Sequence, residues 1–380
     1  MTHIEARDEN TSAPDLTSGD GETYAEGAIP CYNAEGTAEE QGFAPIFFDQ
    51  KAEKRNFSRL GFGFAIFSMI YLAVSLIIQI AAKIIYPELL EATWFLNLIS
   101  PVSIYLFGAP VLLLIVGGMR AEKPEKKKMK FSVWLMILVI CLGVMYIGAF
   151  VGNGLMSFIS EIIAQFFTST PSNGLTSLID IDNLWITAIG VVIIAPIGEE
   201  LIFRKLIIDR LGRYGAFVSI FLSALMFGLM HGNFYQFFYA FGVGLIFGYV
   251  YYHTGRIWLT IALHAAVNFF GSILSTLLAA GTADMEEALA ALETEELMAQ
   301  LGVYADHIWV VFASIVFSSL VVSAIVSTIV LPIVLRKKIA LPKGSNQLPK
   351  GKAYATVVFN VGIIVMFVVY GFEFLLSLIP

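Results

Sequence analysis

The chain has 380 residues, of which 57% are hydrophobic and 14% charged, with a mean hydropathy of +0.77 and a net charge of −7. Soluble globular proteins carry about 25% charged residues, so this composition excludes an ordinary soluble domain. Apolar runs of roughly 20 residues, the length that crosses a bilayer, recur along the chain. They predict an all-α polytopic membrane protein with eight or nine transmembrane helices around an intramembrane polar cavity. Among its partners we expect the lipid bilayer and no nucleic acid.

The N-terminal segment differs in composition from the rest of the chain. Residues 1–50 contain eleven acidic residues and a single arginine. Such a segment cannot bury enough apolar surface to fold alone. We therefore expect an acidic disordered tail over residues 1–56, in the cytoplasm, and a transmembrane domain over residues 57–380.

The transmembrane domain is expected to contain nine apolar spans. In chain order they lie at about 58–86, 93–118, 131–155, 183–208, 215–231, 235–252, 257–279, 307–335 and 354–378. The fourth, fifth and seventh carry polar residues and are expected to build the cavity. The last two show no polar constellation and are expected to be peripheral packing helices.

Basic residues gather in the loops that would share one side of the membrane. Clusters at 51–55, 120–130, 204–213, 256 and 336–352, together with Arg59, hold 21 of the 23 basic residues. Short cytoplasmic loops collect Lys and Arg, so these clusters predict a cytoplasmic N-terminus. With no organelle address visible, we expect a multi-pass protein of a bacterial plasma membrane, with the endoplasmic reticulum as the alternative.

The loop at 281–306 is the longest on the other side of the membrane. It has seven acidic residues and no basic ones. Its Met285, Leu289 and Leu292 follow helical spacing. We expect an amphipathic helix lying on the outer membrane surface, with a lid or a partner contact as alternatives.

Three spans break the apolar pattern at helical spacing. They contain Glu199-Glu200-x-x-x-Arg204, Phe227-x-x-x-His231 and His264-x-x-x-Asn268. Residues four apart share a helix face, so Glu200 and Arg204 can pair, whereas Glu199 faces another neighbour. An ionised side chain near the membrane centre costs roughly 2.5–3.5 kcal/mol on insertion scales and usually marks a functional site.

A proline three residues before the first of these motifs favours a kink there. Pro196 has no backbone N–H, and in an α-helix this frees the carbonyl of residue 192.

These residue types share one chemical purpose, which is the hydrolysis of an amide bond. A glutamate beside a histidine can take a proton from water and return it to a leaving amine. Glu199, His231 and His264 can alternatively hold a divalent metal such as zinc with one open position, and a metal-free glutamate mechanism stays open. Asn268 can donate a hydrogen bond to the oxyanion that forms on the attacked carbonyl.

The three motifs, in this order on successive membrane helices, resemble the CAAX protease and bacteriocin-processing enzyme family of intramembrane endopeptidases. The likeness covers a catalytic core at about 180–280. The resemblance implies that Glu199 acts as general base together with His231. It implies that Glu200 pairs with Arg204 or helps to bind a metal, and that His264 and Asn268 bind the scissile carbonyl. The implied substrate is a membrane-associated and, in some relatives, lipidated protein or peptide.

Two other functions fit parts of the same pattern. Intramembrane Glu, His and Arg also mark the ion paths of proton-coupled transporters, although no second copy of the Pro-interrupted acidic helix is found. A non-catalytic membrane adaptor on a protease scaffold is the remaining alternative.

Overall fold

The computed structural model describes residues 49–167, 169, 184–292, 297–336, 339, 341–345, 348 and 351–379. Within these ranges every regular element is helical, which confirms the predicted all-α class. The predicted acidic tail lies outside the described residues except for its last positions, where a helix begins after Asp49. The Asp49 carboxylate caps that helix by accepting hydrogen bonds from the backbone N–H groups of Lys51 and Ala52.

The first half of the chain contains α1 (Gln50–Ile85), η1 (Pro87–Leu90), α2 (Thr93–Pro101), η2 (Val102–Gly108), α3 (Ala109–Val116) and α4 (Phe131–Ile163). The middle contains α6 (Leu184–Ala188), η3 (Ile189–Ile194), α7 (Ala195–Glu200), η4 (Leu201–Ile208), α8 (Asp209–Leu211), η5 (Gly212–Tyr214), α9 (Ala216–Leu229), α10 (Phe234–Thr254) and α11 (Ile257–Asn268). The last part contains η6 (Phe269–Leu274), α12 (Ser275–Ala290), α13 (Leu297–Asp306), α14 (Ile308–Leu335), α15 (Ala353–Val357) and α16 (Val361–Leu376). The segments η2, η3, η4 and η6 are π-helical stretches inside longer helices.

Seven continuous helices of the described residues are long and apolar enough to cross a membrane. Two shorter apolar helices, Ala216–Leu229 and Val361–Leu376, correspond to the predicted fifth and ninth spans. The nine apolar segments therefore occur where the sequence places them. Several helices are longer than expected. The first begins at Gln50 and α4 extends to Ile163. The helix from Leu184 reaches Tyr214, and the one that begins at Ile257 continues to Ala290.

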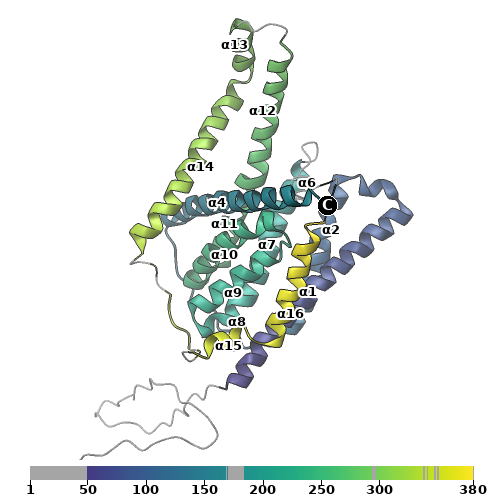
Figure 1. The fold of residues 1–380 in the computed structure, drawn as a ribbon. Coiled ribbons are helices and arrows are strands. Elements are labelled where there is room, and N and C mark those ends of the chain that lie inside the picture. Colours follow the sequence, from purple (N-terminus) through teal and green to yellow (C-terminus); the bar gives the residue numbers. More distant parts are fainter. Residues whose placement is uncertain are drawn as a thin grey trace, which may run out of the picture.

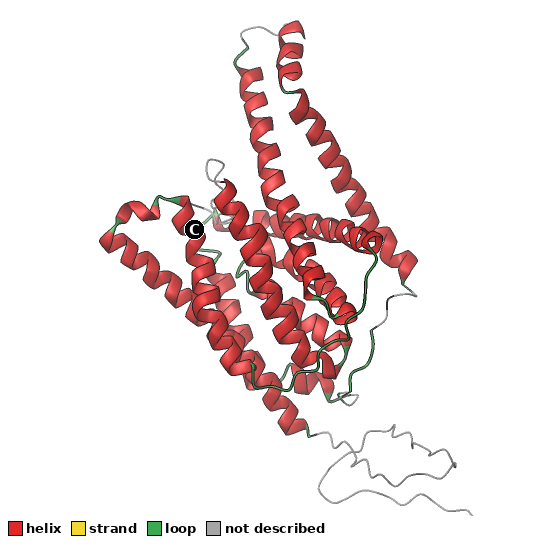
Figure 2. Ribbon diagram, turned by 180° about the vertical axis from the view of Figure 1, so that it is seen from behind, coloured by secondary structure: helices red, strands yellow, loops and turns green. Residues whose placement is uncertain are grey.

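The helices form a bundle crossed by one long helix (Figures 1 and 2). Figure 1 shows α4 running across the others, and it packs on α10, α11 and α14. The segment from α7 to η4 packs against α9 and α11, and α1 pairs with α16 on one flank. The polar motifs thus lie on helices that contact one another in the middle of the bundle.

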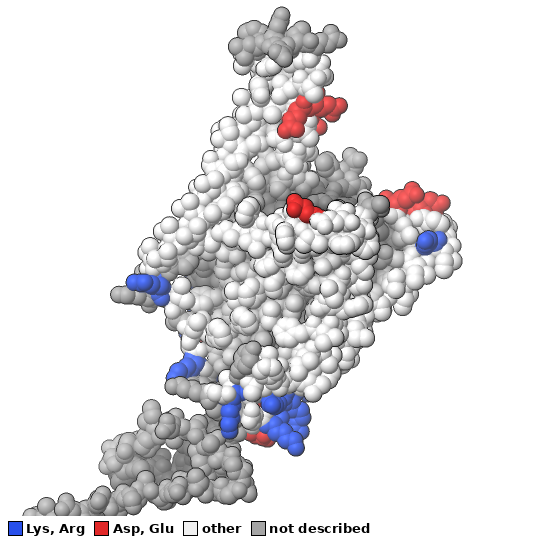
Figure 3. Space-filling model, viewed as in Figure 1, with Lys and Arg blue, Asp and Glu red and all other residues white. Residues whose placement is uncertain are grey.

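Most of the described basic residues lie at the lower end of the molecule in Figure 3. Arg213 forms an ion pair with Glu53 at 2.8 Å, which joins the clusters at 51–55 and 204–213. The backbone N–H of Lys127 donates to Thr254, and the hydroxyl of Ser345 donates to Glu122. These contacts tie the loops at 120–130 and 336–352 to the same end, while the acidic residues of α12 lie at the opposite end.

The expectation of a surface-lying helix at 281–306 is wrong for its described part. Residues 275–290 form α12, which continues straight from α11 and η6 as one helix. Figure 1 shows α12 and α14 extending beyond the bundle with α13 at their tip. No proline interrupts the run between Asn268 and Ala290, so the helix can continue past the apolar part of the span.

The prediction that both final spans are peripheral holds for α14 but is wrong for α16. Most of α14 is exposed, whereas α16 carries the buried residue Glu373. The Glu373 carboxylate accepts hydrogen bonds from the hydroxyls of Ser68 and Tyr71 on α1, the latter at 3.1 Å. A β-carbon added to Gly232, next to His231, would lie 3.4 Å from this carboxylate. The last helix therefore packs against the turn that carries a motif histidine.

Glycines allow α1 and α16 to approach closely. A β-carbon at Gly61 would overlap the backbone of Gly362, and one at Gly362 would overlap that of Ser58. Gly371 lies on the exposed side of α16, where a β-carbon would have no neighbouring atom of the described residues within 4 Å. Close backbone packing of this kind stabilises helix pairs in membranes.

We expect Gly61→Val to lower the unfolding temperature of the detergent-purified protein by several degrees, because overpacking a tight contact costs about 1–3 kcal/mol. Gly371→Ala on the same helix pair is the control and should unfold like the wild type. Equal unfolding temperatures for Gly61→Val and the wild type would show that α1 and α16 do not pack in this way.

Candidate active site

The three sequence motifs come together on neighbouring helices. Glu199 and Glu200 end α7, and Arg204 follows in η4 one turn later. His231 lies in the turn after α9, while His264 and Asn268 lie one turn apart on α11. Direct contacts between α7 and α11 bring the glutamates to His264.

Glu200 is the centre of a buried ionic cluster. Its side chain has 0% exposure, and its Oε1 lies 3.1 Å from Nδ1 of His264. Its Oε2 lies 3.3 Å from Nε of Arg204, at the i,i+4 spacing that the sequence predicts. One carboxylate thus contacts a cation on its own helix and a histidine on another.

Arg204 lies between aromatic rings. Its guanidinium carbon lies 4.6 Å from the ring centroid of Phe227 and 5.4 Å from that of Phe247. The residue has 0% exposure. Cation–π contacts strengthen when the cation is desolvated, so these rings help to hold the charge in the interior. Phe227, the first residue of the second motif, therefore has a defined place beside the cation.

Glu199 points to the other side of His264. Its Oε2 lies 3.6 Å from Nε2 of that ring, and 12% of its side chain is exposed, against 0% for Glu200. The two adjacent glutamates therefore flank one imidazole ring and differ in how exposed their side chains are. Glu200 is enclosed with Arg204, whereas Glu199 can be reached from outside the cluster.

His231 lies near the cluster but makes different contacts. Its Nδ1 lies 2.9 Å from the carbonyl oxygen of Phe227. Because a carbonyl oxygen only accepts hydrogen bonds, Nδ1 carries the proton, and in the neutral ring Nε2 has a free lone pair. The ring centroid of Phe227 lies 5.2 Å from that of His231 and 5.6 Å from that of His264. One aromatic ring thus contacts both motif histidines.

The Asn268 side chain donates a hydrogen bond to a backbone carbonyl that Pro196 leaves without an N–H donor. In η3 the N–H of Ala195 donates to the carbonyl of Gly190, five residues earlier. The same pattern would pair Val191 with residue 196, but proline has no N–H. The side-chain amide of Asn268 donates to the Val191 carbonyl instead, at 2.8 Å.

The freed carbonyl is therefore that of residue 191, one position before the one expected for an α-helix. The expectation assumed α-helical geometry, and the π-helical stretch shifts the hydrogen-bonding partner by one residue.

The residues suggested as metal ligands do not converge as a metal site. Both ring nitrogens of His264 face glutamates, at 3.1 and 3.6 Å. Among the described residues no group of three His, Cys, Asp or Glu side chains is arranged to hold an ion. The placement of Glu199, His231 and His264 does not fit a three-ligand centre, and we derive no chemical step through a metal.

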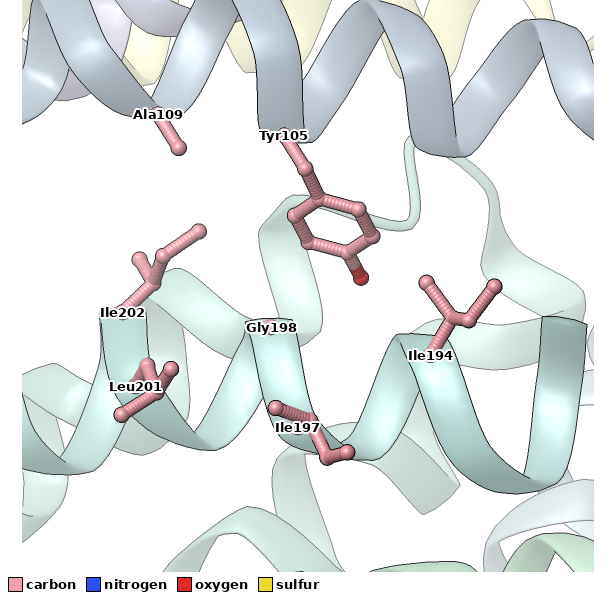
Figure 4. A pocket seen from close by; sticks show the side chains of 7 residues that line it. All are labelled: Tyr105, Ala109, Ile194, Ile197, Gly198, Leu201 and Ile202. Atoms are coloured by element: carbon pink, nitrogen blue, oxygen red, sulfur yellow. The ribbon is translucent and has the colours of Figure 1, made fainter.

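An apolar cavity of about 410 Å³ lies beside Glu199, between the second and fourth spans (Figure 4). The residues that line it are Tyr105, Ala109, Ile194, Ile197, Gly198, Leu201 and Ile202. Ile194, Ile197 and Leu201 are also exposed on the outer surface of the bundle. The cavity therefore opens at the surface of the bundle and reaches Gly198, the residue before Glu199.

Sequence reasoning missed two polar residues near the motifs. Tyr105 lies in an apolar run of the second span, and a single tyrosine there has no periodic signal. Glu373 could have been found, because an ionisable residue within a span is a functional candidate by default.

The stability of the protein is expected to depend on both members of the buried Glu200–Arg204 pair. Removing one charge of a buried pair typically costs about 3–5 kcal/mol, because the other charge is left uncompensated. We therefore expect Arg204→Met to destabilise the purified protein strongly, and Glu200→Gln combined with Arg204→Met to recover part of the loss. The free energies of unfolding of the wild type, both single variants and the double variant, measured by denaturation, give the coupling free energy of the pair. A double variant that is less stable than Arg204→Met would contradict a mutually compensating pair.

Comparison with known proteins supports the resemblance read from the motifs. Residues 181–270 match the family model described as Type II CAAX prenyl endopeptidase Rce1-like. No curated protein and no solved structure matches the chain. The matched segment contains all three motifs, from Glu199 to Asn268. At residues 181–270, which hold all the motif residues, the chain is therefore similar to the type II CAAX prenyl endopeptidase Rce1-like model.

Proposed function

We propose that this protein is an intramembrane endopeptidase that hydrolyses a peptide bond of a membrane-associated protein or peptide. The observation that carries the proposal is the convergence of Glu199 and Glu200 on His264, at 3.6 and 3.1 Å, within apolar helices. Burying such a cluster is costly. A catalytic role accounts for that cost and agrees with the matched family.

In this proposal Glu199 is the general base, because it is the more accessible of the two glutamates. It takes one proton from a water molecule as the water oxygen forms a bond to the substrate's carbonyl carbon. The carbonyl π electrons move to the oxygen, giving a tetrahedral oxyanion. Glu199 then gives the proton to the leaving nitrogen as the C–N bond breaks. The Nε2 lone pair of His231 supplies a second acceptor for the attacking water.

Two groups on α11 are proposed to bind the carbonyl oxygen. The Asn268 amide has two N–H donors, and one of them is used on Val191. The second is free to donate to the oxyanion. When both ring nitrogens of His264 carry protons, Nδ1 donates to Glu200, and Nε2 can donate to the oxyanion.

Glu200 and Arg204 are proposed to orient rather than to react. A carboxylate bonded to one imidazole nitrogen fixes the ring and directs the other nitrogen at the reaction centre. The ion pair with Arg204 keeps Glu200 charged for this purpose. The buried Glu200 carboxylate is therefore proposed to hold the His264 ring in place, which accounts for the cost of burying it.

The proposed substrate is held in the membrane, since the cluster lies among apolar spans. The family description names prenyl endopeptidases, which favours a lipidated C-terminus over an unmodified peptide precursor. We also propose that the basic end faces the cytoplasm of a bacterial cell, because Lys and Arg collect in cytoplasmic loops.

The proposal predicts that Glu199→Gln abolishes cleavage. Quantitative profiling of new protein N-termini in host membranes should show peptides that are present with the wild type and absent with the variant at equal expression. Glu161→Gln, which changes an exposed glutamate on α4, is the matched control and should keep them. Identical profiles for the wild type and a folded Glu199→Gln would refute the proposal.

Loss of Asn268 should slow the reaction rather than weaken substrate binding. Removing one oxyanion donor costs about 10²–10³ in kcat, so the kcat of Asn268→Ala should fall by that factor with KM little changed. Asn153→Ala is the control, because Asn153 is exposed and bonds within its own helix. A transporter would tolerate the loss of Asn268, and an unchanged kcat would rule out its role as an oxyanion donor.

A further inference from the structure

An ordered loop with exposed lysines precedes α4 at the basic end of the molecule (Figure 3). Residues 120–130, here called the lysine loop, contain six basic and two acidic residues. Four of its lysines have exposed side chains: Lys126, Lys127, Lys128 and Lys130. Lys127 forms an ion pair with Glu125 at 3.1 Å, whereas no acidic side chain of the described residues pairs with the other three. The loop therefore presents uncompensated positive charge on the surface.

Backbone contacts hold the lysine loop against the turn between α10 and α11. The N–H of Lys127 donates to the carbonyl of Thr254 at 2.8 Å, and the Arg256 guanidinium donates to the Lys127 carbonyl at 2.9 Å. Gly255 has a φ of +59°, and a β-carbon there would overlap the carbonyl oxygen of Pro124. The lysine side chains therefore project from a backbone that is held in place.

Aromatic side chains flank the lysine loop where two spans begin. Phe131, at the start of α4, is 74% exposed, and its ring stacks on that of Trp134. The Trp134 indole N–H donates to the carbonyl of Leu259 on α11 at 3.1 Å. Trp258, the residue before Leu259, is 71% exposed. Tryptophan is enriched at the headgroup level of membrane proteins, which puts the beginning of both spans, and the loop beside them, at that level.

We propose that the lysine loop binds the headgroups of anionic phospholipids in the leaflet at the basic end. Basic residues immediately beside a membrane span are attracted to anionic headgroups. The competing partner on the same chain is the acidic segment at residues 1–48. A lipid layer fits better, because it offers negative charge to the lysines and also an interface for the exposed Trp258 ring. Such a lipid-binding surface goes beyond the proposed endopeptidase function and does not depend on it.

The test measures how added lipid changes the unfolding temperature of the full-length protein in detergent. The loop variant replaces three exposed lysines: Lys126→Gln, Lys128→Gln and Lys130→Gln. The control variant removes three exposed charges elsewhere at the basic end: Lys51→Gln, Arg55→Gln and Lys343→Gln. Without added lipid both variants should unfold like the wild type, because substitutions of exposed residues cost little stability.

Phosphatidylglycerol should raise the unfolding temperature of the wild type and of the control variant by several degrees, because a ligand that binds the folded state stabilises it. The loop variant should need about tenfold more of this lipid for the same rise, since each lysine near the headgroups contributes to the attraction. High salt should remove this difference. Phosphatidylcholine and inorganic phosphate should affect all three proteins equally, which distinguishes an anionic lipid from a neutral lipid and from a free anion.

Equal responses of the wild type and the loop variant to phosphatidylglycerol would overturn the proposal, and so would a wild type that does not respond. An equal loss of response in both variants would also overturn it, because the effect would then follow net charge rather than the loop.

A carbodiimide, which joins lysines to carboxylates in contact with them, tests the competing partner. Cross-links between the loop lysines and residues 1–48 that persist in phosphatidylglycerol would assign the loop to the acidic segment and overturn lipid binding. Loss of such cross-links on adding the lipid would support it. Neither readout uses peptidase activity, so failure of the lipid surface and failure of the proposed function are seen separately.

Discussion

The structure depends on how one carboxylate, that of Glu200, is held in an apolar interior. It is fully buried and contacts Arg204 on its own helix and His264 on α11. Neither ionic partner would be stable there alone, because an unpaired buried charge is expensive. The Phe227 and Phe247 rings beside the guanidinium extend the cluster to α9 and α10. Four helical segments thus meet around one charge, and this fixes where Glu199 lies relative to His264.

The backbone polar groups at the site also need hydrogen-bonding partners within the protein, because they lie in an apolar interior without water. A proline in a π-helical stretch leaves the Val191 carbonyl without a backbone donor, and the Asn268 side chain supplies one. This hydrogen bond joins the fourth span to α11 next to the glutamates. The residue proposed to bind the oxyanion is therefore also fixed in place by the helix that carries the general base. The Asn268 side chain therefore has both a positioning role and a proposed chemical role.

Much of this arrangement could be predicted from the sequence, because it rests on local spacing. The apolar runs predict the spans, the i,i+4 spacing predicts the Glu200–Arg204 pair, and the basic loops predict one common end. Contacts between distant spans were not predictable in this way. The pairing of His264 with both glutamates, the register shift at Pro196 and the approach of Tyr105 across Gly198 depend on how separate helices pack. Glu373 had a readable signal, whereas Tyr105 had none, since a tyrosine in an apolar span is ordinary until its neighbour is known.

The central claim is that Glu199 activates water for attack on an amide bond. The most direct measurement reconstitutes the protein in vesicles with membrane proteins of its host, in water enriched in ¹⁸O, and analyses the products by mass spectrometry. The account predicts new C-terminal carboxylates that carry ¹⁸O from the solvent, formed by the wild type and not by Glu199→Gln. Cleavage that persists in Glu199→Gln, or the absence of any labelled product with the folded wild type, would contradict it.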